Sequence, residues 1–282
     1  MGEVYAEPRF FIKEMEMDNR AIGFFDSGLG GLTSVPVLKR ALPNEKVLYF
    51  GDTARTPYGS KSPDTVCKFS AQIVDYLVSK NVKLIVIACN TVTAMALDML
   101  REKHPEVPIF GVIDPTARRV AADGVCNVGI IGTKVTIESG VYAESIHSLN
   151  PNINTYSLAC PAFVPLIEEG IIDNEIMDLT IKYYMDDFVK NNNIDSLILG
   201  CTHYPLIAAN IKRIYPELKL YNSSAEVISD VVDILTEKDM LAGENDFPDR
   251  FYASDLSENF LRMTNTLFEG YDTKIKLKKL DD

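Results

Sequence analysis

The sequence predicts an α/β fold made of two pseudo-symmetric parallel-sheet domains, and three observations lead to this prediction. Short apolar runs alternate with segments of helical periodicity along most of the 282 residues, as in parallel sheets covered by helices. Two runs are near copies, LIVIACNTVT beginning at Leu84 and LILGCTHYPL beginning at Leu197. Each copy ends its apolar run close to a cysteine, Cys89 or Cys201. The copies indicate an internal duplication that places one thiol at the tip of an equivalent strand in each domain.

Eight short apolar runs are predicted as buried strands, and they fall into two series of four. Corresponding runs are offset by between 106 and 112 residues and keep the same order. One such match would mean little, but four in order make a duplication the best single explanation. Equivalent strand tips would then meet at the domain interface, where we expect the active site. The runs are residues 22–25, 47–50, 84–88 and 109–113, followed by 128–131, 155–158, 196–200 and 218–221.

Helical signals follow most of these strands. Ser62 and Pro63 supply the cap and first-turn proline of one helix, and apolar residues from Val66 to Leu77 recur within it at helical spacing. The other predicted helices show similar patterns, and two of them flank a last apolar run near the C-terminus. They are residues 32–42, 91–103, 173–190, 225–238 and 256–268, with the apolar run at 251–253.

The order of elements predicts the domain organisation. Residues 1–20 have no clean period, so we expect a loosely packed N-terminal extension. Residues 21–113 are predicted to form the first α/β domain together with residues 222–282, which return to it. Residues 114–221 are predicted to form the second α/β domain.

Composition argues against several classes of partner. A net charge of −12 and a pI near 4.8 disfavour nucleic acid, because a phosphate backbone attracts a basic surface. No apolar run approaches a membrane span, and residues 1–20 lack a signal-peptide pattern, so we expect no membrane partner. Five widely spaced cysteines without a C-x-x-C pair fit neither a disulfide framework nor a zinc ribbon. We therefore expect a cytoplasmic, reducing environment, no metal and no cofactor.

The first strand runs into the glycine-rich segment DSGLGG, which begins with Asp26 and Ser27. It resembles a dinucleotide fingerprint only in part, because Thr33 stands where a third glycine is required. Asp52, after the second strand, could mimic the ribose-binding acid of such a site, but we do not expect a nucleotide. Asp26 and Ser27 place a carboxylate and a hydroxyl at the strand tip. Asp26 could equally cap a helix or contact a ligand.

The polar loop GDTARTPYGS lies at the same end of the predicted sheet and contains Tyr58 and Gly59. Loops at this end of an α/β sheet carry function, although Tyr58 could equally pack against the following helix.

Two thiols at equivalent strand tips suit one kind of chemistry. A lone buried cysteine is usually a small apolar residue, but that explanation accounts poorly for matched cysteines with polar neighbours. A helix beginning after each of Cys89 and Cys201 would lower the thiol pKa. One thiolate could remove a proton from a carbon while the opposite thiol returns a proton to the other face. The product is the mirror image of the substrate, and the reverse reaction only exchanges the two roles.

The combination of motifs resembles the glutamate racemases of the aspartate/glutamate racemase superfamily. The resemblance spans residues 22 to about 224, and it departs from many relatives at Thr116, where they have glycine. The motifs are FFDSGLGGL (Phe24–Leu32), GDTARTPYGSKS (Gly51–Ser62), ACNTVTA (Ala88–Ala94), GVIDP (Gly111–Pro115), IGTKVTI (Ile131–Ile137), CPAFVPLIEEG (Cys160–Gly170) and GCTHYPL (Gly200–Leu206).

The resemblance implies a cofactor-independent racemase that interconverts L- and D-glutamate by a two-base mechanism. It implies that Cys89 and Cys201 are the two acid/base thiols, and that Asp52 and Glu168 are supporting carboxylates. D-glutamate supply for peptidoglycan synthesis and a homodimer also come from the resemblance. The residues expected to bind the amino acid are Asp26, Ser27, Tyr58, Gly59, Asn90, Thr91, Thr202 and His203.

Three rival readings remain open at the level of sequence. A cysteine hydrolase would pair Cys201 with His203, but the C-x-H spacing is short for a nucleophile and its base, and Cys89 would have no role. A non-catalytic amino-acid-binding module would retain its function after both cysteines were replaced by serine. The third is a racemase or decarboxylase of the same superfamily that acts on another substrate. Measured turnover of glutamate, aspartate and related acids would distinguish it from a glutamate racemase.

Overall fold

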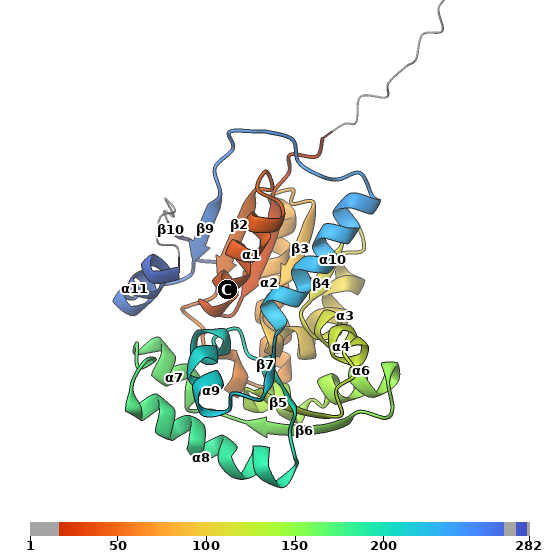
Figure 1. The fold of residues 1–282 in the computed structure, drawn as a ribbon. Coiled ribbons are helices and arrows are strands. Elements are labelled where there is room, and N and C mark those ends of the chain that lie inside the picture. Colours follow the sequence, from red (N-terminus) through yellow and green to blue (C-terminus); the bar gives the residue numbers. More distant parts are fainter. Residues whose placement is uncertain (1–16, 268–274, 281–282) are drawn as a thin grey trace, which may run out of the picture.

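The two series of apolar runs form two separate parallel sheets (Figure 1) in the computed structural model, which describes residues 17–267 and 275–280. The first sheet has the order β10-β9-β2-β1-β3-β4, and the second has the order β6-β5-β7-β8. The first-sheet strands are β1 (Ile22–Asp26), β2 (Val47–Gly51), β3 (Leu84–Ile87), β4 (Ile109–Gly111), β9 (Arg250–Ala253) and β10 (Ile275–Leu277). The second-sheet strands are β5 (Asn127–Gly132), β6 (Asn154–Ala159), β7 (Ser196–Gly200) and β8 (Lys219–Asn222).

The predicted duplication is visible in the strand order. β2-β1-β3-β4 in the first sheet corresponds to β6-β5-β7-β8 in the second, and every pairing is parallel. The predicted fold class is therefore confirmed. The strands of the two sheets separate between β4 and β5, and again after β8. The exact domain boundaries at residues 113 and 222 stay a prediction.

Strands β1, β2, β3 and β7 are buried along their whole length because both of their faces are covered, whereas β6 has no fully buried residue. Phe24 and Phe25 of β1 are neighbours in sequence, yet they belong to different apolar clusters on opposite faces of the first sheet. The cluster that contains Phe24 continues into the second sheet through Ile131 and Leu199. One apolar core therefore joins the two halves of the molecule.

Helices surround both sheets (Figure 1). Ser62 caps α2 as predicted, because its side chain accepts a hydrogen bond from the Thr65 N–H. Asn222 caps α10 in the same way by accepting from the Ser224 N–H. The helices are α1 (Ser34–Ala41), α2 (Pro63–Ser79), α3 (Asn90–Lys103), α4 (Ile113–Ala122), α5 (Lys134–Glu138), α6 (Val141–Leu149), α7 (Phe163–Glu168), α8 (Glu175–Asn191), α9 (Ala208–Ile214), α10 (Ser223–Glu237) and α11 (Glu258–Leu267), with 3₁₀ turns η1 (Gly30–Thr33), η2 (Tyr58–Ser60) and η3 (Tyr204–Ile207).

Three local expectations differ from the structure. The fourth strand ends at Gly111 rather than Ile113, because Ile113 already begins α4. The segment predicted as a helix from Leu32 starts as the 3₁₀ turn η1. Cys201 is followed by η3, so no α-helix begins directly after it as it does after Cys89.

Two strands of the C-terminal segment belong to the first sheet. β9 pairs with β2, and β10 adds a further parallel strand beyond it. β10 was not predicted, because its three residues carry too little pattern to distinguish a strand from a loop.

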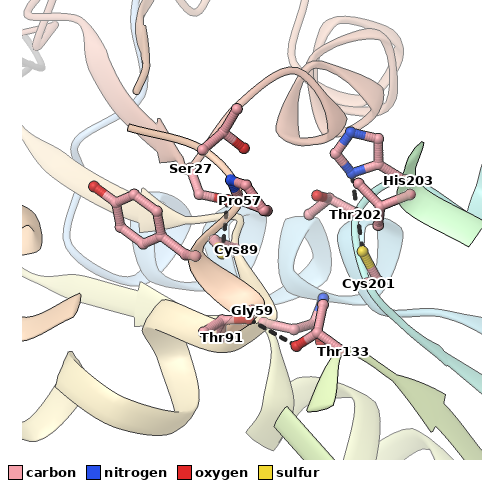
Figure 2. A pocket seen from close by; sticks show the side chains of 13 residues that line it. Ser27, Pro57, Gly59, Cys89, Thr91, Thr133, Cys201, Thr202 and His203 are labelled. Atoms are coloured by element: carbon pink, nitrogen blue, oxygen red, sulfur yellow. Dashed lines mark hydrogen bonds between the residues drawn. The ribbon is translucent and has the colours of Figure 1, made fainter. Parts of the chain in front are cut away.

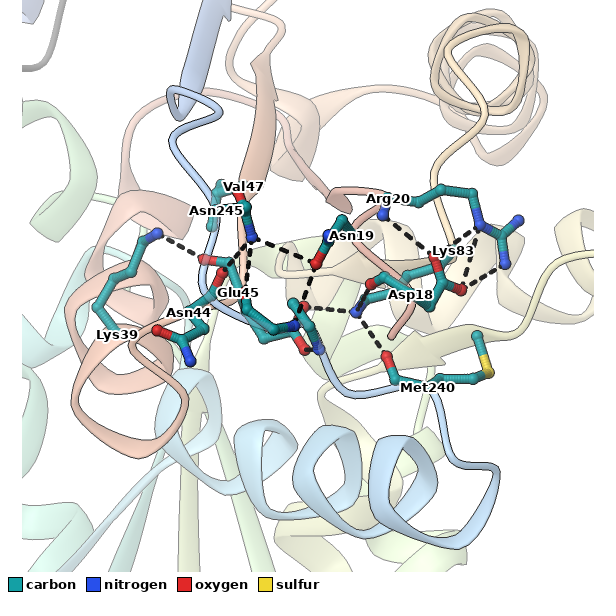
Figure 3. A network of polar contacts seen from close by, with 12 residues as sticks. Asp18, Asn19, Arg20, Lys39, Asn44, Glu45, Val47, Lys83, Met240 and Asn245 are labelled. Carbon is teal, nitrogen blue, oxygen red and sulfur yellow. Dashed lines mark hydrogen bonds and ion pairs between the residues drawn. The ribbon is translucent and has the colours of Figure 1, made fainter. Parts of the chain in front are cut away.

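A buried polar network holds the first described residues of the chain against the amino-terminal end of the first sheet (Figure 3). Lys83 lies just before β3, and its Nζ donates to the backbone oxygens of Asp18 at 2.8 Å and Met240 at 2.6 Å. The same nitrogen pairs with Glu45 at 2.6 Å, and both side chains are almost completely buried. We expected residues 1–20 to pack loosely, and this expectation is wrong for Asp18, whose backbone oxygen accepts a hydrogen bond from Lys83. Residues 1–16 lie outside the described residues.

Within the described ranges, no helix is long and apolar enough to cross a membrane.

Candidate active site

A pocket lies between the carboxyl ends of the two sets of strands (Figure 2). Cys89 enters it two residues after β3, and Cys201 enters it directly after β7, the equivalent strand of the second sheet. In the close view the two thiols come from opposite sides of the pocket. The lining residues are Ser27, Thr56, Pro57, Tyr58, Gly59, Cys89, Asn90, Thr91, Thr133, Val164, Cys201, Thr202 and His203.

Cys89 occupies the N-cap position of α3, and the residue is 5% exposed. Its Sγ lies 3.3 Å from the Ser27 hydroxyl, to which the thiol donates. Burial raises the pKa of Cys89 to about 12, and the nearby Asp26 carboxylate adds to the effect. The expectation that a helix N-terminus would lower this pKa is therefore wrong for Cys89, because desolvation outweighs the favourable backbone contacts of α3.

Cys201 has a different set of neighbours, although it is also only 6% exposed. Its Sγ lies 3.9 Å from Nδ1 of His203, and Nε2 of the same ring lies 3.1 Å from Oε1 of Glu168. Burial alone would lower the pKa of His203, but the Cys201 and Glu168 side chains outweigh it and raise that pKa to about 10. His203 is therefore an imidazolium at neutral pH, held between a carboxylate and the thiol.

Asp26 is fully buried and is not among the residues that line the pocket. Its Oδ2 accepts hydrogen bonds from the backbone N–H groups of Gly28 at 3.1 Å and Gly31 at 3.0 Å. The Thr202 hydroxyl donates to its Oδ1 at 3.4 Å. Of the two roles left open by the sequence, the observed contacts are those of a backbone cap. Asp26 lies behind the pocket and supports Thr202, which lines it.

Asp52 also lies behind the pocket rather than in it. Its carboxylate accepts hydrogen bonds from the Tyr58 hydroxyl, from Arg55 Nε at 2.7 Å and from the Ser254 hydroxyl at 2.8 Å. Burial and the adjacent Asp52 carboxylate raise the pKa of Tyr58, so its hydroxyl stays protonated and remains a donor. Asp52 thereby anchors Tyr58, which lines the pocket.

Asn90 and Thr91, at the start of α3, contact the first residue of α10, a tyrosine of α6 and the residue that follows β5. The Asn90 amide nitrogen donates to Ser223 at 3.2 Å, and its oxygen accepts from Tyr142 at 2.6 Å. The Thr91 hydroxyl lies 3.0 Å from that of Thr133. These contacts link the thiol-bearing end of β3 to the facing half of the molecule.

Two glycines allow the halves to approach at the pocket. A Cβ at Gly59 would lie 2.5 Å from Cβ of Thr133, and a Cβ at Gly30 would collide with the hydroxyl of Thr202. Each glycine comes from a loop of the first sheet and faces a threonine that follows a strand of the second. No larger residue fits at either contact without moving one half.

Four lining residues were not singled out from the sequence. Thr133 follows β5 as Ser27 follows β1, so the duplication itself identifies it as an equivalent hydroxyl. Thr56 and Pro57 belong to the loop that contains Tyr58, but nothing in their sequence marks them. Val164 reaches the pocket from α7, and this placement depends on the packing of that short helix.

The described part of the chain contains no group of three or more His, Cys, Asp or Glu side chains that could hold a metal ion.

The family model described as Asp/Glu/Hydantoin racemase matches residues 35–231. A curated glutamate racemase from Geobacter metallireducens is 44% identical over 254 residues, which cover 89% of this chain and 93% of that protein. The chain belongs to the glutamate racemase family. A second family member, the glutamate racemase from Sulfurihydrogenibium sp., is 44% identical over 92% of this chain and 98% of its own length.

Solved structures of this family share the architecture. The glutamate racemase from Francisella tularensis subsp. tularensis, in complex with D-glutamate, is 40% identical, with a TM-score of 0.88 over 94% of this chain and 99% of that chain. The enzyme from Thermus thermophilus, in complex with beta-chloro-D-alanine, is 37% identical with a TM-score of 0.84. An aspartate racemase from Picrophilus torridus, at 19% identity and a TM-score of 0.57, shares the fold.

Proposed function

We propose that this chain interconverts L- and D-glutamate without a cofactor, with Cys89 and Cys201 as the two acid/base groups. The observation that carries the proposal is the pair of thiols brought to opposite sides of one pocket by equivalent strands. The substrate assignment is supported by family relatives named glutamate racemase and by the D-glutamate complex of a 40%-identical relative.

In the proposed reaction one thiolate removes the α-proton of glutamate from one face. The opposite thiol then delivers a proton to the other face, and the chiral centre inverts. Cys89, with its pKa raised to about 12, is suited to hold a proton at neutral pH. The His203 imidazolium beside Cys201 provides a cation that stabilises a thiolate at that position. The two thiols therefore have different electrostatic surroundings: a hydroxyl and a buried carboxylate lie near Cys89, and a cation lies beside Cys201.

The α-proton of an amino acid is far less acidic than a thiol, so the site must stabilise a carbanion-like state. We assign substrate contacts to the polar groups that line the pocket, because fixed donors around a developing charge lower the barrier without reorganising. Few of these groups are exposed to solvent, which strengthens their interactions with the substrate. They are Ser27, Tyr58, Gly59, Asn90, Thr91, Thr202 and His203, and we add Thr133. Asp26, Asp52 and Glu168 support them from behind.

We further propose a cytoplasmic homodimer whose D-glutamate product is used in peptidoglycan synthesis. This part rests on the family relationship and on the acidic composition without a disulfide pattern. We also propose two domains divided at residues 113/114 and 221/222, as the distribution of strands between the sheets supports.

The test is to incubate the purified chain separately with L-glutamate and D-glutamate, without added cofactor, and to follow optical activity to equilibrium. Equal final mixtures from both enantiomers are expected, with aspartate and related acids turned over much more slowly. Faster turnover of another amino acid would replace the substrate assignment. A covalent acyl adduct on Cys201 would favour a hydrolase, and binding without turnover would favour an amino-acid-binding module.

A further inference from the structure

Asp52 is a fully buried carboxylate whose two oxygens are used differently. Oδ2 accepts from both the Tyr58 hydroxyl and Arg55 Nε, whereas Oδ1 accepts from the hydroxyl of Ser254. A carboxylate removed from water needs donors on both oxygens, because an unpaired buried acceptor is costly. Ser254 thus satisfies the oxygen that the active-site loop does not.

Ser254 comes from the opposite end of the chain, directly after β9. It is 7% exposed and is not a pocket residue. Its hydroxyl accepts from the Ala54 N–H at 2.9 Å while it donates to Asp52, and its own N–H donates to the Gly51 oxygen at 3.0 Å. One residue therefore makes three hydrogen bonds to the loop that begins at the end of β2.

The adjacent residue extends this attachment. The Thr53 hydroxyl donates to the backbone oxygen of Asp255 at 2.6 Å and accepts from its N–H at 2.8 Å. Residues 51–54 are thus paired along their length with residues 254–255.

The same loop continues into one wall of the pocket. Tyr58 is fixed through its hydroxyl to Asp52, and Gly59 lies against Thr133 of the facing half. A shift of the Asp52 carboxylate would therefore be passed to Tyr58 and to the gap between Gly59 and Thr133.

We propose that Ser254 is a positioning residue of the site, an inference that rests on the proposed racemase function. Its hydroxyl fixes Asp52, and through Asp52 it holds Tyr58 and Gly59 against the substrate. The C-terminal return, remote in sequence from both thiols, thereby sets the shape of the binding pocket.

The direct test is the steady-state kinetics of Ser254→Ala with glutamate. Loss of the hydroxyl leaves Asp52 Oδ1 and the Ala54 N–H without their partner, and the wall at Tyr58 relaxes. Because that wall contacts substrate and transition state alike, KM is expected to rise about five- to tenfold with kcat within about twofold. Ser254→Cys, which carries a weaker donor of similar shape, is expected to give a smaller rise in KM. This variant replaces Ser254→Ala in the test if the alanine variant does not fold.

Two control variants separate positioning from general destabilisation. Ser70→Ala makes the same substitution at a buried serine of α2 whose hydroxyl has no hydrogen-bond partner among the described residues. Asp195→Ala removes the acceptor of the Cys126 and Asn127 N–H groups, at the end of the second sheet away from the pocket. Asp195→Ala should lower the melting temperature, and both controls should keep the KM of the unmodified chain.

A double-mutant cycle with Tyr58→Phe tests the route through Asp52. If Ser254 acts through Asp52 and Tyr58, the KM increases of the two single variants will not multiply in the double variant. Independent increases, or an unchanged KM in Ser254→Ala and Ser254→Cys with an active unmodified chain, would overturn this inference alone. An unmodified chain that does not racemise glutamate would overturn both the inference and the proposed function.

Discussion

The two thiols occupy equivalent positions of a duplicated fold, yet their surroundings differ. Cys89 contacts the neutral hydroxyl of Ser27, and burial raises its pKa to about 12. Cys201 lies beside His203, which Glu168 holds in its cationic form. Duplication explains where the sulfur atoms are, whereas later divergence of the neighbouring residues explains why the two thiols have different contacts. A reaction that is symmetric overall is thus assigned to two chemically unequal halves.

The largest effect is expected when either thiol is removed. Cys89→Ser and Cys201→Ser should each reduce kcat/KM for racemisation at least about 10³-fold, because a serine hydroxyl is a much weaker acid than a thiol. Chiral chromatography of glutamate after long incubation measures the residual rate. Cys126→Ser, at an exposed cysteine outside the pocket, is the matched control and should remain fully active. Normal activity in either active-site variant would remove that thiol from the mechanism.

Loss of the cation beside Cys201 should have the next largest effect. His203→Asn keeps a polar side chain but removes the imidazolium, and kcat is expected to fall about 10²-fold. The comparison is sharpened if the same variant leaves the alkylation rate of Cys89 by iodoacetamide unchanged, as read by peptide mass spectrometry. An equal change at both thiols would contradict separate environments.

His203 also predicts a pH dependence of stability. Its pKa in the folded chain is about 10, above its ordinary value of 6.5. The stabilisation from protonated His203 is therefore complete below about pH 6.5 and is lost as the pH rises through about 10. Melting temperatures of the unmodified chain and His203→Asn, measured between pH 6 and 10.5, should differ most at low pH and converge at high pH. A constant difference would contradict the raised pKa.

Closing the gap between the halves should be less damaging than removing the charged groups. Gly59→Ala and Gly30→Ala force a Cβ against Thr133 and Thr202, and a displacement of the pocket wall is expected to reduce kcat/KM some tens of fold. Gly243→Ala, which meets only the flexible side chain of Met17, is the control and should retain its activity. Unchanged kinetics in both pocket variants would show that the halves separate easily.

The smallest effect is expected when the neutral hydrogen bond between Cys89 and Ser27 is removed. Ser27→Ala removes one hydrogen bond from Cys89, and a neutral hydrogen bond contributes about 0.5–1.5 kcal/mol, so kcat should fall only about two- to tenfold. Stopped-flow or coupled assays resolve such a change. A loss as large as that of His203→Asn would make the two sides equivalent.

Much of this arrangement was predictable from sequence because it depends on periodicity and repetition. Cys89 and Cys201 end apolar runs, and parallel strands bring such positions to one edge of each sheet. The same logic explains Thr133, the equivalent of Ser27. The position of Asp26 behind the pocket was not predictable, because a carboxylate there can be satisfied either by capping backbone N–H groups or by contacting a ligand.

Contacts between distant segments were beyond the reach of local patterns. The raised pKa of Cys89 follows mainly from its burial among residues that are distant in sequence, such as Phe25 and Tyr58, and no single stretch of sequence encodes that packing. Ser254 meets Asp52 only because β9 pairs with β2. A lone serine after a four-residue strand carries no signal of that meeting.

In the proposed mechanism the two thiols act on opposite faces of one carbon. Single-turnover racemisation of L-glutamate in D₂O tests it most directly, with NMR and mass spectrometry of both enantiomers at early times. Deuterium is expected at the α-carbon of nearly all D-glutamate formed, and almost none is expected in the remaining L-glutamate. D-glutamate that retains the original hydrogen, or L-glutamate that exchanges as fast as product forms, would show that a single base serves both faces.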